Sequence, residues 1–286
     1  QIIYKLNYAW RFTAHASYKE RYGEMTDLYD RPYQTDYRNS VWNCGILPVY
    51  RQQLYSVYGE YKSTAREFFA TVNLTHNREW YNRIYEQRIE NGQVQRVSLP
   101  LSNHGSGYTV KSTLSKGFYD LGLKTSLMAL LNISKAEQIS GGQRLPYQYR
   151  LMRLEPKVIW TPNRHWETSY QTDIRYGGSK IGERTRLAPL WNVTQQVQLS
   201  YIFSPIEASL SVDHYHNDVN EDQSVNSVFA DFSVLWKSRR WQITATATNL
   251  FDKRTYAYTR YASLESYTSW VRIRPREFLV AIRYRL

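Results

Sequence analysis

Residues 191–213, WNVTQQVQLSYIFSPIEASLSVD, form two alternating stretches separated by Ser204-Pro205. In 191–201 the odd positions are mainly apolar and the even positions are polar. In 206–213 the even positions are apolar and the odd positions are polar. Because successive side chains of a β-strand point to opposite faces, each stretch predicts a strand with one apolar face. Together they predict a hairpin with a tight turn.

The same alternation recurs along the whole chain of 286 residues. It is strong in 2–18, 121–134, 191–201, 206–213, 228–237, 241–248 and 276–286, and weaker in 50–62, 67–81, 106–117, 148–160 and 166–176. These segments predict about twelve strands. Residues 2–18 are expected to be one strand, much longer than the five or six residues usual in globular proteins. A tilted membrane strand of about 9–11 residues, extended beyond the bilayer, explains such a length.

The connections between these segments are of two kinds that alternate along the chain. Four are short, namely 63–66, 161–165, 204–205 and 238–240, whereas 20–49, 135–147, 177–190, 217–224 and 252–271 are long and polar. Aromatic residues flank the short ones, as in the pairs Trp160/Trp166 and Trp236/Trp241. Short periplasmic turns, long extracellular loops and an aromatic girdle are typical of an outer-membrane β-barrel.

The composition agrees with this fold class. The chain has 26 Tyr, 9 Trp and 9 Phe, yet its mean hydropathy is −0.62. No segment approaches the roughly 18 apolar residues of a spanning helix, which excludes a helical membrane protein. The alternative is a soluble β-sandwich or lipocalin-like barrel. Strand length, loop asymmetry and the aromatic girdle favour the membrane barrel, and solubility without detergent would distinguish the two.

The C-terminal region carries a family resemblance. Asn249-Leu250-Phe251-Asp252-Lys253 is followed by Arg274-Pro275-Arg276-Glu277-Phe278, which opens the alternating final strand. This arrangement resembles the C-terminus of TonB-dependent outer-membrane receptors, especially the Bacteroidetes type, over about residues 245–286. Family members usually end in Phe, and this chain ends in Leu286.

The resemblance implies a barrel of about 22 strands with an N-terminal plug domain. With room for about twelve strands, residues 1–286 are expected to be one outer-membrane β-barrel domain, the C-terminal portion of such a barrel without its plug. Because unpaired backbone groups in lipid cost several kcal/mol each, the strands at 2–18 and 276–286 must pair with each other or with another polypeptide. Gln1 is not followed by a signal peptide, so either a signal was removed or the chain begins partway through a longer protein.

Basic residues give the net charge of +12. Lys5, Arg11, Lys124, Arg283 and Arg285 share the polar parity of their strands. A charge on the lipid face would cost about 2–4 kcal/mol at mid-membrane, so we expect these side chains to face the lumen. They are expected to pair with acidic residues of a plug or loop, or alternatively to attract anionic solutes.

Basic residues of the loops suggest a different partner. Arg184, Arg186 and Arg254 could meet lipopolysaccharide phosphates. Nucleic acid is not expected as a partner, because the positive charge is spread through an alternating wall rather than gathered in a patch.

Residues that could carry chemistry are few. His214 and His216 share a strand face, but a third metal ligand is not evident nearby, so we expect a polar rim. Cys44 is the single cysteine and is expected to be a free thiol. Asn91-Gly92 predicts a hairpin turn, and the glycine pairs at 141–142 and 177–178 predict mobile loops. We expect no enzyme activity, no cofactor and no metal.

The leading hypothesis is therefore the barrel of a TonB-dependent receptor in the bacterial outer membrane, taking up a nutrient or metal chelate. Its expected partners are membrane lipid and lipopolysaccharide, the remaining barrel or plug polypeptide, TonB and a surface lipoprotein. Two alternatives are a scaffold barrel in a multi-protein surface complex and a self-contained twelve-strand passive pore.

Overall fold

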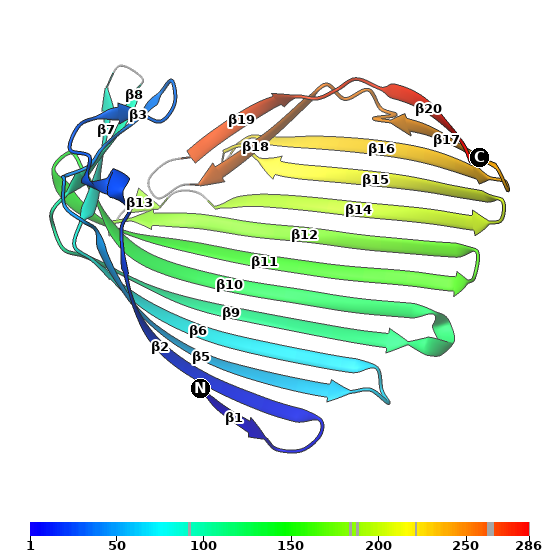
Figure 1. Ribbon diagram of the computed structural model, residues 1–286, viewed down its shortest axis with the longest axis horizontal. Helices are drawn as coiled ribbons and strands as arrows, with labels where there is room; N and C mark the ends of the chain where they lie inside the picture. The colour runs from blue at the N-terminus through cyan, green and yellow to red at the C-terminus, as the bar shows by residue number, and fades with distance from the viewer. Residues whose placement is uncertain (91–92, 183–184, 187–188, 221, 262–265, 286) are drawn as a thin grey trace.

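The computed structural model describes residues 1–90, 93–182, 185–186, 189–220, 222–261 and 266–285. Most of this chain forms one curved antiparallel sheet, the wall (Figure 1). Its strands, in spatial order, are β1 (Ile2–Lys5), β2 (Trp10–Tyr22), β5 (Val49–Ser63), β6 (Phe68–Tyr81), β9 (Asn103–Phe118), β10 (Leu123–Ser140), β11 (Gln143–Asn163), β12 (Trp166–Ile181), β14 (Leu190–Phe203), β15 (Ile206–Asp218), β16 (Ser224–Lys237), β17 (Trp241–Thr248) and β20 (Glu277–Tyr284).

The register of the wall keeps apolar positions opposite apolar positions. Leu210 of β15, for example, lies opposite Leu199 of β14 and Phe232 of β16. A slip of one residue would move every apolar side chain to the polar face, so the pattern specifies the register. Each of the twelve predicted segments overlaps one of the twelve long strands, which confirms the predicted all-β, antiparallel wall.

The prediction of one continuous strand over residues 2–18 was wrong. Residues 2–18 are not continuous, because β1 and β2 form a hairpin with a turn at 6–9. The side chain of Asn7 accepts hydrogen bonds from the backbone N–H groups of Ala9 (2.8 Å) and Trp10 (2.9 Å), which stabilises this turn. The wall therefore has one short strand, β1, beyond the predicted number.

Several of the predicted long loops are partly regular. Residues 135–147 are not a loop. Strand β10 continues to Ser140 and β11 begins at Gln143. Gly141 and Gly142, with φ of +56° and +75°, join the two strands. These glycines form a tight turn, and Gly177 and Gly178 lie within β12. Residues 252–271 contain the hairpin of β18 (Thr255–Tyr261) and β19 (Ser266–Arg272), and 177–190 contains β13 (Thr185–Arg186).

Small elements gather at the long-loop end of the wall (Figure 1). They are the 3-10 helix η1 (Met25–Leu28), β3 (Tyr33–Gln34), β4 (Asn39–Trp42), β7 (Ile84–Glu90) and β8 (Gln93–Leu99), while the 3-10 helix η2 (Tyr119–Leu121) lies at the opposite, short-turn end. Two local contacts are parallel, β4 with β8 and β7 with β10. The predicted hairpin is present as β7–β8, but its Asn91-Gly92 turn lies outside the described residues. None of the helices in the described ranges is long and apolar enough to cross a membrane.

The wall is a single layer, and its apolar face has no second layer against it. In the described part of the chain only six apolar residues are buried, namely Ile84, Val97, Ile139, Leu190, Ala230 and Ala257. Large apolar side chains in the middle of strands remain open, as with Val72 (43 % exposed) and Leu74 (48 % exposed). A soluble sandwich would bury these positions, so a hydrocarbon environment accounts for them better.

The margins of the wall are β1 and β20, which lie on opposite sides in Figure 1. The pairings among the described residues run from β1 to β20, and none of them joins these two strands. Both margins are open: Ile2 is 72 % exposed and Phe278 is 73 % exposed. Each margin can therefore accept a further strand.

Candidate functional site: the polar inner face of the wall

The wall has two chemically different faces, and aromatic contacts identify the outer one. At the short-turn end the outer face carries a row of rings that touch across neighbouring strands. The ring centroids of Trp10 and Tyr61 lie 4.8 Å apart, those of Trp166 and Tyr201 4.7 Å, and those of Trp241 and Tyr284 4.8 Å. The predicted girdle is confirmed as a structural feature, which places the polar residues of opposite parity on the inner face.

Register places four of the five predicted basic residues, Lys5, Arg11, Lys124 and Arg283, on this inner face, whereas Arg285 follows the end of β20. Lys5 lies opposite Arg11, whose guanidinium pairs with Glu60 of β5 at 2.5 Å. Lys124 lies opposite Gly117 and Ile159 on its two neighbouring strands. Arg283 lies opposite Gln242, and the backbone N–H of Arg285 donates to the carbonyl of Arg240.

These five residues do not form one cluster. Lys5 and Arg11 lie at one margin of the wall, Arg283 and Arg285 at the other, and Lys124 between them. Within the described chain, Arg11 is the member of this set whose side chain contacts a carboxylate. That carboxylate belongs to the wall itself, whereas the sequence interpretation placed such acids in a plug or loop.

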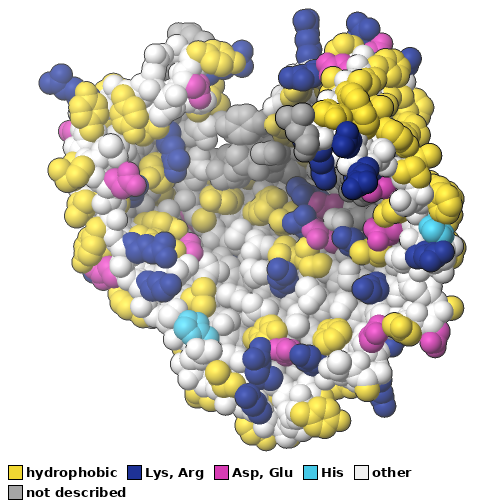
Figure 2. Space-filling model, turned by 45° about the vertical axis from the view of Figure 1, so that its right-hand side comes forward, with side chains coloured by type: hydrophobic (Ala, Val, Ile, Leu, Met, Phe, Trp, Pro, Cys, Tyr) yellow, Lys and Arg dark blue, Asp and Glu magenta, His cyan; other side chains and the backbone are white. Residues whose placement is uncertain are grey.

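The inner face instead has its charges concentrated around Asp173 of β12. Arg153 of β11 donates to both carboxylate oxygens of Asp173, at 2.9 and 3.0 Å. Arg175 donates to Oδ2 of Asp173 at 2.5 Å from one terminal nitrogen and 3.0 Å from Nε. Arg153 also contacts Glu155. Two guanidinium groups therefore share two carboxylates, so this cluster is charge-balanced. Figure 2 shows basic and acidic side chains interspersed over the hollowed face.

Strand β18 borders this cluster, and together they line a cleft of about 490 Å³. Asn217 of β15 holds β18 in place: its Nδ2 donates to the carbonyl of Ala257 at 3.0 Å and to Tyr256 Oη at 3.1 Å. Thr259 donates to the carbonyl of Val219 at 3.2 Å. The cleft is lined by polar and aromatic side chains, among them Tyr149, Arg175, Asn192 and Tyr256.

A second polar centre, Glu79 of β6, lies nearer the long-loop end of the inner face. Its carboxylate accepts hydrogen bonds from Tyr50 (3.0 Å), Tyr81 (2.8 Å), Gln52 (3.0 Å) and Asn77 (2.8 Å). Such a set of neutral donors stabilises an ionised carboxylate without a cation. Glu79 is therefore a polar centre whose four hydrogen-bond donors are all neutral.

Above Glu79 lies the mouth cleft, of about 710 Å³, which we define by Tyr81, Arg83, Tyr85, Arg96 and Tyr147. Arg96 stacks on the Tyr85 ring with its guanidinium carbon 3.6 Å from the ring centroid, and Arg83 lies 5.0 Å from the same centroid. The cleft thus offers aromatic faces and guanidinium donors to a solute arriving from the long-loop side.

An ion pair fastens η1 to the edge of this cleft. Arg83 donates to Asp27 Oδ1 at 2.8 Å. Partial burial opposes ionisation, but the hydrogen bond from Arg83 and the backbone N–H of Glu24 outweigh it, so the pKa of Asp27 is lowered from its usual 3.8. Because the pKa of Asp27 is lowered on folding, its ion pair with Arg83 stabilises the fold fully above pH about 4. This contribution is lost as the pH falls below that value.

Replacing Arg83 by Gln is expected to loosen η1 at neutral pH. Asn43 donates to the carbonyl of Thr26 in η1 at 3.1 Å and directly precedes Cys44, so a loosened η1 should expose the thiol. We expect Cys44 to react several-fold faster with a methanethiosulfonate reagent in Arg83→Gln than in the wild type. The exposed Arg88→Gln serves as the control, and equal rates in all three proteins would refute the clasp.

The residues of the family motif build a corner rather than a binding site. Asn249 is 7 % exposed, with φ of +51°. Its Nδ2 donates to the carbonyls of Lys253 (2.7 Å) and Arg274 (2.9 Å), and its Oδ1 accepts from the N–H of Lys253 (3.0 Å). Asp252 accepts from Arg254 and from the N–H of Arg276, which lowers its pKa. Leu250 is tied through its N–H to Ala230, and Phe251 is 55 % exposed.

The other candidate chemical groups remain apart from these clefts. His216 contacts Asp218 at 3.3 Å and Asn226 at 2.9 Å, and no group of three possible metal ligands occurs in the part of the chain that is described. Cys44 lies 3.7 Å from Ser98 Oγ and is unpaired. Of the three loop bases, Arg254 pairs with Asp252, while Arg184 and the side chain of Arg186 lie outside the described residues.

Sequence reasoning missed Asp173, Glu79 and the mouth cleft. Their only sequence signal is polar parity, which they share with dozens of other residues. What singles them out is the cross-strand register, which places Arg153 directly opposite Arg175 and Tyr50 directly opposite Tyr81.

The fold and the two faces define the class of this chain: it is a segment of a transmembrane β-barrel wall. No family model and no curated protein sequence matches it. The ferric yersiniabactin uptake receptor FyuA of Yersinia pestis is similar in structure, with 8 % identity and a TM-score of 0.45 over 99 % of this chain and 49 % of that receptor. The translocator domain of autotransporter NalP from Neisseria meningitidis has 11 % identity and a TM-score of 0.30 over 98 % and 89 %.

The ferric-catecholate import receptor Fiu of E. coli K12 has 8 % identity and a TM-score of 0.30 over 99 % of this chain and 61 % of that receptor. This chain thus spans about half the length of FyuA. The similar structures include receptors and an autotransporter, and at these TM-scores they indicate no particular function for this chain.

Proposed function

We propose that this chain forms part of the barrel of a TonB-dependent receptor in the bacterial outer membrane. The observation that carries the proposal is the position of the mouth cleft, at the long-loop end of a wall whose inner face is predominantly polar. The motif at 249–253 supports it, because the chain resembles these receptors at that corner and at 274–278. In this proposal the loops and the mouth cleft capture a nutrient or metal chelate, and the inner face conducts it.

The open margins at β1 and β20 support the proposal of a further polypeptide partner. An unpaired strand edge in hydrocarbon is costly, so we propose that strands of additional polypeptide pair with both and complete a larger barrel. A plug and TonB would belong to the same assembly. The charge-balanced cluster at Asp173 suits passage of polar solutes of either charge.

The experiment measures uptake by cells that carry the full-length receptor or a deletion variant of it. In the variant, residues 25–42, which comprise η1 to β4, are replaced by a short glycine and serine linker. We expect uptake, screened on limiting nutrients and metal chelates, to fall at least tenfold and the remaining uptake to stop with a protonophore. The control is a two-glycine insertion in the short turn at 238–240. Unchanged uptake after the excision would overturn the capture role.

Two alternatives predict different results. A passive pore would give a large steady conductance in a planar bilayer and uptake that a protonophore does not affect. A scaffold barrel would co-purify with stable partner subunits, and its loss would cause no growth defect on any nutrient.

A further inference from the structure

The outer face of the wall changes from apolar to basic within two rows of residues. Cross-strand register defines these rows, which run across β6, β9, β10, β11 and β12. Starting on the apolar side, the rows are Leu74–Val110–Leu131–Met152–Tyr176, then His76–Tyr108–Ile133–Arg150–Gly178, then Arg78–Ser106–Lys135–Gln148–Lys180. The third row has three cations and no acid.

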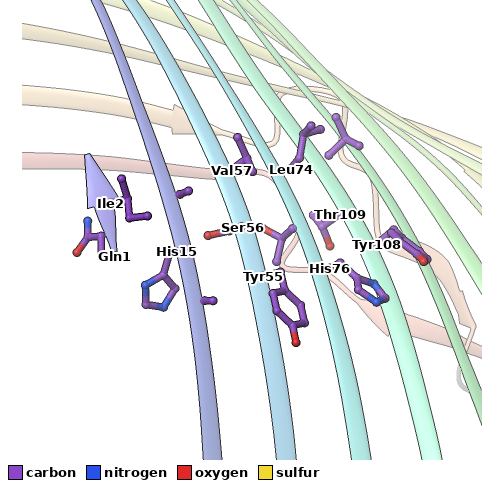
Figure 3. A pocket seen from close by; sticks show the side chains of 14 residues that line it. Gln1, Ile2, His15, Tyr55, Ser56, Val57, Leu74, His76, Tyr108 and Thr109 are labelled. Carbon is purple, nitrogen blue, oxygen red and sulfur yellow. The ribbon is translucent and has the colours of Figure 1, made fainter. Parts of the chain in front are cut away.

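The middle row marks where the hydrocarbon ends. Tyr55, His76 and Tyr108 stack in a line across β5, β6 and β9, with ring centroids 6.4 and 4.2 Å apart (Figure 3). The ring of His76 is further held by the carbonyl of Gly107 at 2.9 Å and by Arg78 at 3.3 Å. Rings with an apolar body and a polar atom concentrate at the boundary between lipid and water. The third row therefore lies at the level of lipid headgroups.

Three bases on adjacent strands form what we call the outer basic patch: Lys135, Arg150 and Lys180. Lys135 and Lys180 lie opposite the same residue, Gln148, from its two sides. None of the three contacts a carboxylate in the described part of the chain. Glu137, which lines the same groove as Lys135 and Lys180, is already paired with Arg144 at 3.1 Å.

The patch is also hollowed. A groove of about 280 Å³ is lined by Lys135, Gln148 and Lys180 together with His104 and Glu137. A phosphate group fits such a place, because ammonium and guanidinium groups make their strongest hydrogen bonds to anionic oxygens. A solute inside the barrel cannot reach this face, so the patch has no part in conduction.

We propose that the outer basic patch binds the phosphate groups of lipid headgroups in the leaflet on the long-loop side. The occupant is a phosphorylated membrane lipid whose acyl chains lie along the apolar rows while its phosphates contact the three bases. This interaction fixes the depth and tilt of the wall in the membrane. It is independent of the transport role proposed above.

The test is binding of diphosphoryl lipid A by the complete receptor in detergent, measured by native mass spectrometry. Each basic residue near a charged membrane surface contributes about 1 kcal/mol, so the triple variant Lys135→Gln/Arg150→Gln/Lys180→Gln should raise Kd roughly 100-fold. The matched control, Lys111→Gln/Lys124→Gln/Lys157→Gln, removes the same charge from the inner face of β9, β10 and β11 and should leave Kd unchanged. The charge-preserving Lys135→Arg/Lys180→Arg should also bind as the wild type does.

Dephosphorylated lipid A should bind at least tenfold more weakly than the diphosphoryl form. Inorganic phosphate at the same concentration should not compete, because it lacks the acyl chains. The proposal is overturned by equal binding of the two lipids, by competition from inorganic phosphate, or by equal losses in the outer and inner triple variants. If the outer triple variant does not fold, Lys180→Gln alone gives the same comparison, with an expected loss of roughly fivefold.

Discussion

Replacing Leu127 by lysine is expected to destabilise the folded wall in lipid by about 2–4 kcal/mol, because the side chain lies on the outer face near the membrane midplane. Leu127 lies on β10 opposite Leu114 and Pro156. Its level is about halfway between the aromatic row at the short turns and the row of His76 and Tyr108. A charge there would have to enter hydrocarbon. The measurement is the free energy of unfolding by guanidinium in lipid vesicles, followed by tryptophan fluorescence.

The neighbouring residue provides the matched control. Met128 has a similar volume and lies on the inner face, opposite Thr113 and Glu155. Met128→Lys should change the unfolding free energy by less than about 1 kcal/mol, because the new ammonium meets water and the carboxylate of Glu155. If both lysines cost the same, the two faces do not differ in environment and the wall is not a membrane wall.

Replacing Asn249 by alanine is expected to cost about 3 kcal/mol, because it removes three hydrogen bonds at a nearly buried position. The carbonyls of Lys253 and Arg274 and the N–H of Lys253 would lose their partner together. The corner joins β17, the β18–β19 hairpin and the start of β20, so all three should loosen. Hydrogen exchange over residues 249–285 would detect this.

Two further variants separate the causes. Asn249→Gly relieves the positive φ but also removes the hydrogen bonds, so it should be nearly as unstable as Asn249→Ala. Asn220→Ala removes an exposed turn asparagine, whose side chain accepts from the N–H of Asp222 at 3.0 Å, and should cost less than about 1 kcal/mol. A fully stable Asn249→Ala would show that the corner is held by other contacts.

The long strands could be predicted from sequence because one physical constraint acts on every second residue within the bilayer. The turn at 6–9 could not, for a geometric reason: in the β1–β2 hairpin Tyr4 lies opposite Phe12 and Lys5 opposite Arg11. Even positions thus face even positions, and the alternation passes through the turn unchanged.

The extension of β10 and β11 was missed for the opposite reason. Beyond Ile133 and Arg150 neither face of the hairpin lies against hydrocarbon, so alternation disappears although the backbone pairing continues to Ser140 and Gln143. The inner clusters depend on the exact cross-strand register, which brings Arg153 to Asp173 and Tyr50 to Glu79. The inner parity of Lys5, Arg11, Lys124 and Arg283 was predictable, but the pairing of Arg11 with Glu60 of the wall was not.

The central claim is that alternate residues of one strand face hydrocarbon and water. The most direct measurement is electron paramagnetic resonance of single spin labels at positions 127–132 of β10, in a Cys44→Ser background reconstituted in lipid. Labels at 127, 129 and 131 should be accessible to oxygen and protected from a water-soluble nickel complex, and those at 128, 130 and 132 should show the reverse. Leu130 is decisive, because it is apolar but lies on the inner face opposite Lys111 and Arg153. Accessibility without a period of two, or a lipid-exposed label at position 130, would contradict the account.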